Sequence, residues 1–101
     1  MKYVYIWQFE AIEGKETEFE DVYGSVGAWV KLFQRDSNYL QTMLIRDIQI
    51  KGRYLTVDIW KNRESFNSFK ESFKSEFEAL DKQCESLTTV ETKIGEYAVM
   101  E

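Results

Sequence analysis

Few side chains in this sequence are suited to catalysis on their own. The chain has no histidine and one cysteine, Cys84. Histidine is the commonest general base, metal ligand and haem ligand, and a lone thiol can form neither an internal disulfide nor a thiolate metal cluster. We therefore expect no metal site, no cofactor and no imidazole-dependent reaction. Cys84, with no imidazole to activate it, is expected to be a small core residue.

The main candidate for acid–base chemistry is Asp58, which stands in the otherwise apolar run YLTVDIW. A carboxylate kept dry has a raised pKa and can act as a base towards a phenolic substrate. The alternative is an ion pair. If a hairpin turns about Gly52, Arg46 and Asp58 lie equally far from the turn and face each other as a cross-strand charge pair. Of the two interpretations, the sequence favours this structural pair.

Aromatic residues make up 16% of the chain, and some can line an apolar pocket for a planar ligand. The alternative is a plain core, which is the favoured interpretation of the helically spaced phenylalanines Phe66, Phe69, Phe73 and Phe77. The candidate ligand-binding residues are Trp7, Tyr23, Trp29, Trp60, Phe69 and Phe73.

The sequence predicts four strands and two helices that position these side chains. Residues 3–11, 39–50, 53–61 and 87–99 have the aromatic and β-branched content of strands, the last broken near Gly95. Apolar residues at helical spacing predict one helix from the acidic residues at 16–21 to about Gln34, and a second from an N-cap at Asn62 to Cys84. Gly24 and Gly27 inside the first helix indicate a bend or a close backbone approach.

The order β-α-β-β-α-β over a single domain, residues 1–101, predicts an α+β, ferredoxin-like fold: a four-stranded antiparallel sheet with two helices on one face. On the first strand, Val4 and Ile6 share one face and large rings such as Trp7 share the other. So many rings on the second face of the sheet predict that it is covered. We expect a two-fold homodimer packed sheet to sheet, with Arg46 and Asp58 on the side that faces the partner.

The net charge of the chain indicates which classes of binding partner to expect. Thirteen basic and eighteen acidic residues give a net charge of −5, which disfavours a phosphate backbone. The segment Lys51-Gly52-Arg53-Tyr54 has a loose likeness to the opening of an RNA-recognition strand, but its later spacing and Asp58 do not fit one. No stretch approaches the ~20 apolar residues of a membrane span. We expect a soluble cytoplasmic protein that binds neither nucleic acid nor membrane.

Nearly the whole chain resembles the antibiotic biosynthesis monooxygenase-like family of the dimeric α/β-barrel superfamily. The resemblance is most specific where a tyrosine, an acidic residue and a tryptophan at the end of the third strand precede a phenylalanine on the second helix. It implies a ferredoxin-like fold, protomers paired through their sheets into a barrel, and a small ligand between sheet and helices. It is carried by Phe19, Tyr23-Gly24, Gly27-Ala28-Trp29, Leu32-Phe33, Tyr39-Leu40, Thr42, Leu44, Asp47, Tyr54-Leu55-Thr56-Val57-Asp58-Ile59-Trp60 and Ser65-Phe66.

Members of this superfamily include cofactor-free oxygenases of aromatic polyketides, isomerases and haem-degrading enzymes. The haem degraders use an asparagine, a tryptophan and a histidine at positions that fall here near Trp7 or Gln8, at Phe69 and near Ala79, so haem degradation is disfavoured. The resemblance implies a cofactor-independent monooxygenase-like protein that acts on or binds a small aromatic or polyketide-like molecule. The alternative is a non-catalytic small-ligand-binding or structural homodimer of the same fold.

Overall fold

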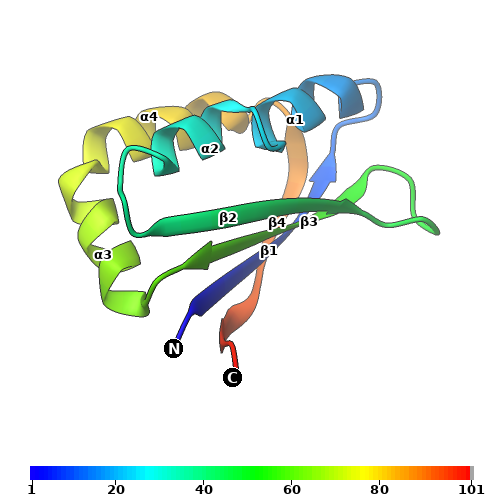
Figure 1. Ribbon diagram of the computed structural model, residues 1–101. Coiled ribbons are helices and arrows are strands. Elements are labelled where there is room, and N and C mark those ends of the chain that lie inside the picture. The colour runs from blue at the N-terminus through cyan, green and yellow to red at the C-terminus, as the bar shows by residue number, and fades with distance from the viewer. Residues whose placement is uncertain (101) are drawn as a thin grey trace.

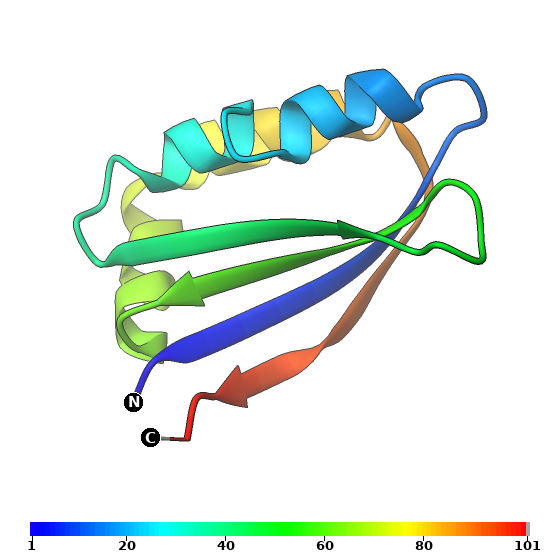
Figure 2. The same cartoon turned by 45° about the vertical axis from the view of Figure 1, so that its right-hand side comes forward.

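The computed structural model describes residues 1–100, which form one four-stranded antiparallel sheet with four helices on one of its faces (Figures 1 and 2). The strand order is β2-β3-β1-β4, which confirms the predicted ferredoxin-like arrangement. None of the helices in these residues has the length and apolar character needed to cross a membrane. The elements are β1 (Tyr3–Ala11), α1 (Glu16–Tyr23), α2 (Ala28–Phe33), β2 (Tyr39–Arg46), β3 (Arg53–Trp60), α3 (Arg63–Ser72), α4 (Lys74–Cys84) and β4 (Thr88–Ala98).

Each predicted helix is divided in two. Between α1 and α2 the chain turns so tightly that a Cβ on Gly27 would lie 2.2 Å from the carbonyl oxygen of Val22, so the glycine serves both a bend and a close backbone approach. Between α3 and α4 the helical geometry is interrupted at Phe73, with φ −114° and ψ 29°. Asn62 caps α3 as expected, because its Oδ1 accepts the backbone N–H of Ser65 at 2.8 Å.

The ring-rich face of the sheet lies beneath the helices. Tyr3 of β1 is paired with Trp60 of β3, and Phe9 with Tyr54, and all four side chains are buried. The helices bring further rings onto them; for example, the ring centroids of Phe19 and Tyr54 lie 4.7 Å apart. The prediction that this face meets a partner is therefore wrong, because the helices contribute rings of their own and the core forms where the rings gather.

The far face of the sheet is aliphatic. Leu55, Val57 and Ile59 of β3 are half-buried, while Met43 and Ile45 of β2 keep 42% and 46% of their surface exposed. Val4 and Ile6 continue this surface on β1, where Tyr97 of β4 lies opposite Val4. Within residues 1–100, no element covers this face.

The hairpin between β2 and β3 has a different register from the one expected. Arg46 lies opposite Tyr54, and Asp58 lies opposite Thr42, so the predicted Arg46–Asp58 pair does not exist. The reason is the connection, which spans residues 47–52 and is organised by Asp47, whose Oδ1 accepts the N–H groups of Gln49 and Ile50. The predicted break in the last strand is wrong, because β4 runs without interruption from Thr88 to Ala98; next to Gly95 there is only a β-bulge, where the register of the β1–β4 pairing shifts.

Candidate functional site

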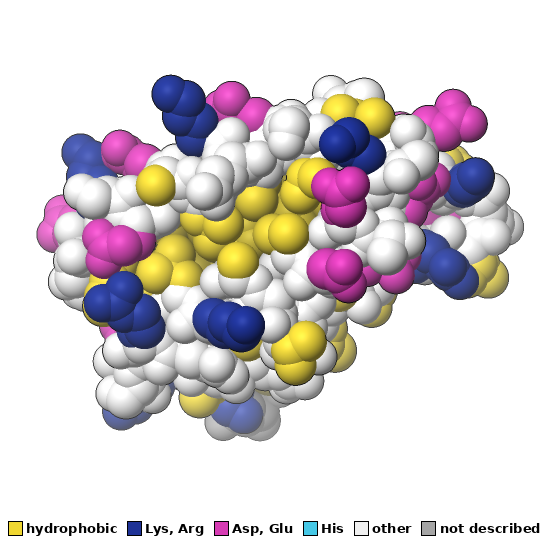
Figure 3. All heavy atoms as spheres, turned by 90° about the horizontal axis from the view of Figure 1, so that it is seen from above, with side chains coloured by type: hydrophobic (Ala, Val, Ile, Leu, Met, Phe, Trp, Pro, Cys, Tyr) yellow, Lys and Arg dark blue, Asp and Glu magenta, His cyan; other side chains and the backbone are white. Residues whose placement is uncertain are grey.

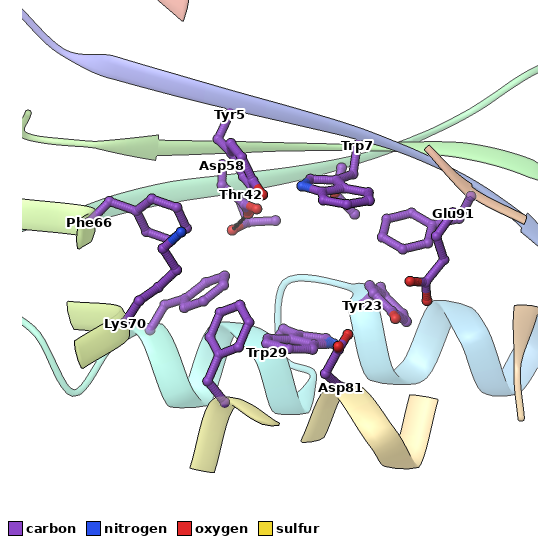
Figure 4. Close-up of a pocket in the computed structure, with 14 residues that line it drawn as sticks. Tyr5, Trp7, Tyr23, Trp29, Thr42, Asp58, Phe66, Lys70, Asp81 and Glu91 are labelled. Atoms are coloured by element: carbon purple, nitrogen blue, oxygen red, sulfur yellow. Dashed lines mark hydrogen bonds between the residues drawn. The ribbon is translucent and has the colours of Figure 1, made fainter. Parts of the chain in front are cut away.

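A cavity of about 200 Å³ lies between the ring-rich face of the sheet and the helices, which is where the resemblance places a ligand (Figure 4). Its walls are mainly aromatic. Seen from above, apolar side chains gather in the middle of the molecule with acidic and basic side chains around them (Figure 3). The aromatic lining residues are Tyr5, Trp7, Phe9, Tyr23, Trp29, Phe33, Phe66 and Phe77, and the polar ones are Thr42, Thr56, Asp58, Lys70, Asp81 and Glu91.

Asp58 is the most enclosed charged group of this cavity, with 7% of its surface exposed. The side chain belongs to β3 and lines the cavity from the sheet side (Figure 4). Burial raises the pKa of its carboxyl group to about 6, against the opposing effect of a hydrogen bond from Thr42. Within residues 1–100 no lysine or arginine forms a salt bridge with it. The interpretation of Asp58 as the partner of Arg46 in an ion pair is therefore wrong. Asp58 remains a candidate for acid–base chemistry.

The hydroxyl groups beside Asp58 form a short chain. The Tyr39 hydroxyl donates to Thr42 Oγ1 at 2.8 Å, and Thr42 Oγ1 donates to Asp58 Oδ1 at 2.6 Å. Thr42 lies directly opposite Asp58 in the β2–β3 ladder. The carboxylate is thus held by a donor from the neighbouring strand.

Other charged side chains line the ends of the cavity. Asp81 of α4 and Glu91 of β4 both have raised pKa values, because each is partly buried and because other acidic groups, Glu85 among them, stand nearby. Lys70 of α3 places its ammonium group 4.8 Å from the centroid of the Phe66 ring. Residues 1–100 contain no group of three or more His, Cys, Asp or Glu side chains placed to hold a metal ion.

The aromatic residues of the walls pack against one another. Trp29 stands edge-on to Phe77, with the centroids 5.0 Å apart, and Tyr23 lies 6.2 Å from Trp29. The indole N–H of Trp29 is buried without a hydrogen-bond partner among the described residues. A buried donor of this kind is costly unless something satisfies it.

Half of the predicted ligand-binding residues line the cavity, namely Trp7, Tyr23 and Trp29. Trp60 and Phe69 do not. Both are fully buried, with their ring centroids 5.0 Å apart, and they form the core next to the cavity. Phe73, at the break between α3 and α4, is also absent from the lining, and its ring is covered by the Arg35 guanidinium at 4.6 Å from the centroid.

The sequence interpretation missed several lining residues. Tyr5 and Phe9 stand two residues before and after Trp7 on β1. Because side chains two residues apart on a strand share a face, the sequence contained the signal that places them beside Trp7. Thr42 follows only from the true hairpin register. Asp81 and Glu91 carry no signal, because acidic residues on a helix and on an edge strand usually face solvent.

No family model matches the chain, and no curated protein matches it in sequence. Its fold is shared with solved structures. SnoaB, a cofactor-independent oxygenase from Streptomyces nogalater, has 17% identity and a TM-score of 0.76 over 99% of this chain and 94% of its own. A proposed antibiotic biosynthesis monooxygenase from Bordetella bronchiseptica has 19% identity and a TM-score of 0.76, covering 99% and 98%. Another from Nitrosomonas europaea has 12% identity and a TM-score of 0.73, covering 98% and 90%.

Proposed function

We propose that this protein binds a small aromatic molecule in the cavity and oxidises it with molecular oxygen, without a cofactor, as a monooxygenase of the antibiotic biosynthesis type. The observation that carries the proposal is Asp58, a buried carboxylate that has no salt bridge among residues 1–100 and lines a cavity with aromatic walls. Perturbed, desolvated carboxyl groups in clefts are typical of acid–base sites. The shared fold with SnoaB, a cofactor-independent oxygenase, supports the same reaction class.

The size and lining of the cavity favour a planar ligand of few rings. Its volume of about 200 Å³ is below the roughly 300–1,000 Å³ of most ligand pockets. Eight aromatic side chains line it, and ring faces and edges bind planar apolar molecules well. A molecule with one polar group directed at Asp58 would satisfy both the apolar walls and the carboxylate.

The proposed reaction is that of an activated ring carbon, as in an anthrone. Asp58 accepts a proton from the CH2 group or its enol hydroxyl, and the resulting carbanion gives one electron to oxygen. Superoxide and the substrate radical then combine into a peroxide, whose O–O bond breaks to leave a carbonyl and release water. The carbon loses four electrons and the oxygen molecule gains four, so no external reductant is needed. The walls exclude water from the reacting anion.

Oxygen uptake with an anthrone tests this proposal. We expect consumption of one oxygen molecule per anthrone, without hydrogen peroxide, above the rate of the protein-free solution. The Asp58→Asn variant should lose about 100-fold or more of the rate, the usual contribution of a general base. Asp21→Asn, which changes an exposed carboxylate on α1, is the matched control and should keep the rate.

The alternative function is ligand binding without turnover. The same experiment separates the two, because a protein that binds anthrone in calorimetry but consumes no oxygen is a binding protein. Both measurements are extended to several anthrones and hydroquinones. A wild-type protein that neither binds any of these compounds nor consumes oxygen with any of them would contradict both functions.

We also propose that the protein is a homodimer, joined through the aliphatic far face of the sheet. This face presents Val57 and Ile59 beside the exposed Met43 and Ile45, and exposed apolar surface of this extent is typical of an interface. Native mass spectrometry should show a dimer, and Val57→Lys should make it monomeric with the far-ultraviolet spectrum unchanged. Ser75→Lys on the exposed side of α4 is the control. A monomeric wild-type protein would contradict the proposal.

A further inference from the structure

The hydroxyl chain from Tyr39 through Thr42 to Asp58 has a defined direction. Each hydroxyl has one proton to donate, and an ionised carboxylate can only accept. The Thr42 proton therefore points to Asp58 Oδ1, at 2.6 Å, and the Tyr39 proton points to Thr42 Oγ1, at 2.8 Å. The direction follows from the chemistry of the three groups.

The chain is anchored at its outer end. The Tyr39 ring packs against Phe33 at 5.5 Å and against Trp60 at 5.4 Å, both between ring centroids. These rings belong to α2 and β3, so the Tyr39 hydroxyl is fixed by the core itself. Thr42 and Asp58 are directly paired across two hydrogen-bonded strands. Little freedom is left for the carboxylate to rotate.

One oxygen of the carboxylate is therefore occupied and the other is available. Within the described part of the chain, the hydrogen bond accepted by Asp58 goes to Oδ1. Asp58 also lines the cavity (Figure 4), and Oδ2 accepts no hydrogen bond from another described residue, so Oδ2 is the oxygen left for a ligand. A carboxylate that keeps a lone acceptor in an apolar cavity binds best to a group that can donate a hydrogen bond.

We propose that Tyr39 and Thr42 are positioning residues, which hold Asp58 so that Oδ2 is a single acceptor for a hydroxyl group of the ligand. The ligand class that follows is an aromatic alcohol, such as a phenol or an enol, and its methyl ether should bind less tightly. The inference rests on the proposed function insofar as the cavity is a ligand site. Its own prediction about Asp58 is independent of any ligand.

Titratable groups on other elements also lie near Asp58 and can influence its pKa. Tyr5 of β1 lies opposite Asp58 in the sheet, and Lys70, Asp81 and Glu91 line the same cavity from α3, α4 and β4. None of them is changed in the variants below. A difference in the titration of Asp58 between these variants therefore reports the hydroxyl chain.

The first measurement is the titration of the Asp58 carboxyl carbon by nuclear magnetic resonance in the ligand-free protein. Thr42→Val removes the donor to Oδ1 at nearly constant volume, and we expect the pKa of Asp58 to rise by about one to two units, the equivalent of one hydrogen bond to a charged group. Thr42→Ser should restore the wild-type value. Tyr39→Phe should shift the pKa in the same direction by less. Thr56→Val, a buried threonine in the same cavity, should leave it in place.

The second measurement is calorimetric titration with 1-naphthol and with 1-methoxynaphthalene, which differ in the donor alone. The wild-type protein should prefer naphthol by about tenfold, and Thr42→Val should lose most of this preference while Thr42→Ser keeps it. An unchanged Asp58 pKa in Thr42→Val overturns the positioning role, and equal wild-type affinity for the two probes overturns the selection of a hydroxyl group. If the pKa shifts as expected but neither probe binds, the proposed ligand fails and the positioning role stands.

Discussion

Replacing Asp58 by asparagine should stabilise the protein at neutral pH. The asparagine keeps an acceptor for Thr42 and has the shape of a protonated aspartic acid, so it removes the charge and little else. Burial raises the pKa of this carboxyl group from 3.8 to about 6, and one pKa unit corresponds to about 1.4 kcal/mol. The ionised form therefore costs the folded state about 3 kcal/mol, and the variant is relieved of that cost.

The pH dependence provides the sharper test. Because the folded-state pKa of Asp58 is raised, the folded protein takes up a proton more readily than the unfolded chain as pH falls through 6. The cost of the buried charge is complete above about pH 7 and disappears near the unfolded pKa of about 4. The advantage of Asp58→Asn over the wild-type protein should thus shrink by about 2 kcal/mol between pH 7.5 and pH 4.5.

Urea unfolding of both proteins at several pH values, at one fixed protein concentration, measures this difference. Other groups that titrate in this range are common to the two proteins and cancel in the comparison. Two curves of free energy against pH that stay parallel would refute the reasoning, because they would show that the Asp58 carboxyl has the same pKa folded and unfolded. A gain in stability with a loss of oxygen uptake would mark Asp58 as a group maintained for function.

Three further substitutions test the fold around the site. Asn62→Ala removes the cap of α3 and should lower the free energy of unfolding by about 1 kcal/mol, with Asn62→Asp retaining most of the wild-type value; equal loss in both would argue against the cap. Gly27→Ala places a Cβ 2.2 Å from the Val22 carbonyl oxygen and should lower the melting temperature, and an unchanged melt would refute the tight turn. Phe69→Ala empties a fully buried site and should cost about 3–5 kcal/mol in urea unfolding, more than Phe73→Ala at a half-buried position.

The order of elements and the two sets of strand residues could be predicted from the sequence, but the assignment of faces could not. The alternation of side chains along a strand shows that Trp7 and Phe9 share one face of the sheet and that Val4 and Ile6 share the other. It does not show which of the two faces the helices cover. Large rings fit a core as well as an interface. The deciding contacts, such as Phe19 against Tyr54, join residues far apart in the chain.

The candidate site was predictable to the same limited degree. Asp58 stands out from sequence alone because a charge within an apolar strand is unusual. Its true partner Thr42 was hidden, since a six-residue connection at 47–52 replaces the short turn about Gly52 and moves every pair of the hairpin. The break at Gly27 was indicated by the glycine and arises from a local backbone approach to Val22, whereas the break at Phe73 has no such signal in its residue type.

The separation of rings from aliphatic side chains across the sheet has a spectroscopic consequence. All three tryptophans stand on the helix side: Trp7 and Trp29 line the cavity, and Trp60 is buried in the core beside it. Selective excitation of tryptophan therefore reports on the interior of the protomer, and quenching or a colour shift in the emission marks the entry of a ligand. Among residues 1–100, Tyr97 is the one aromatic residue of the aliphatic surface, so association through that surface should leave the tryptophan emission nearly unchanged.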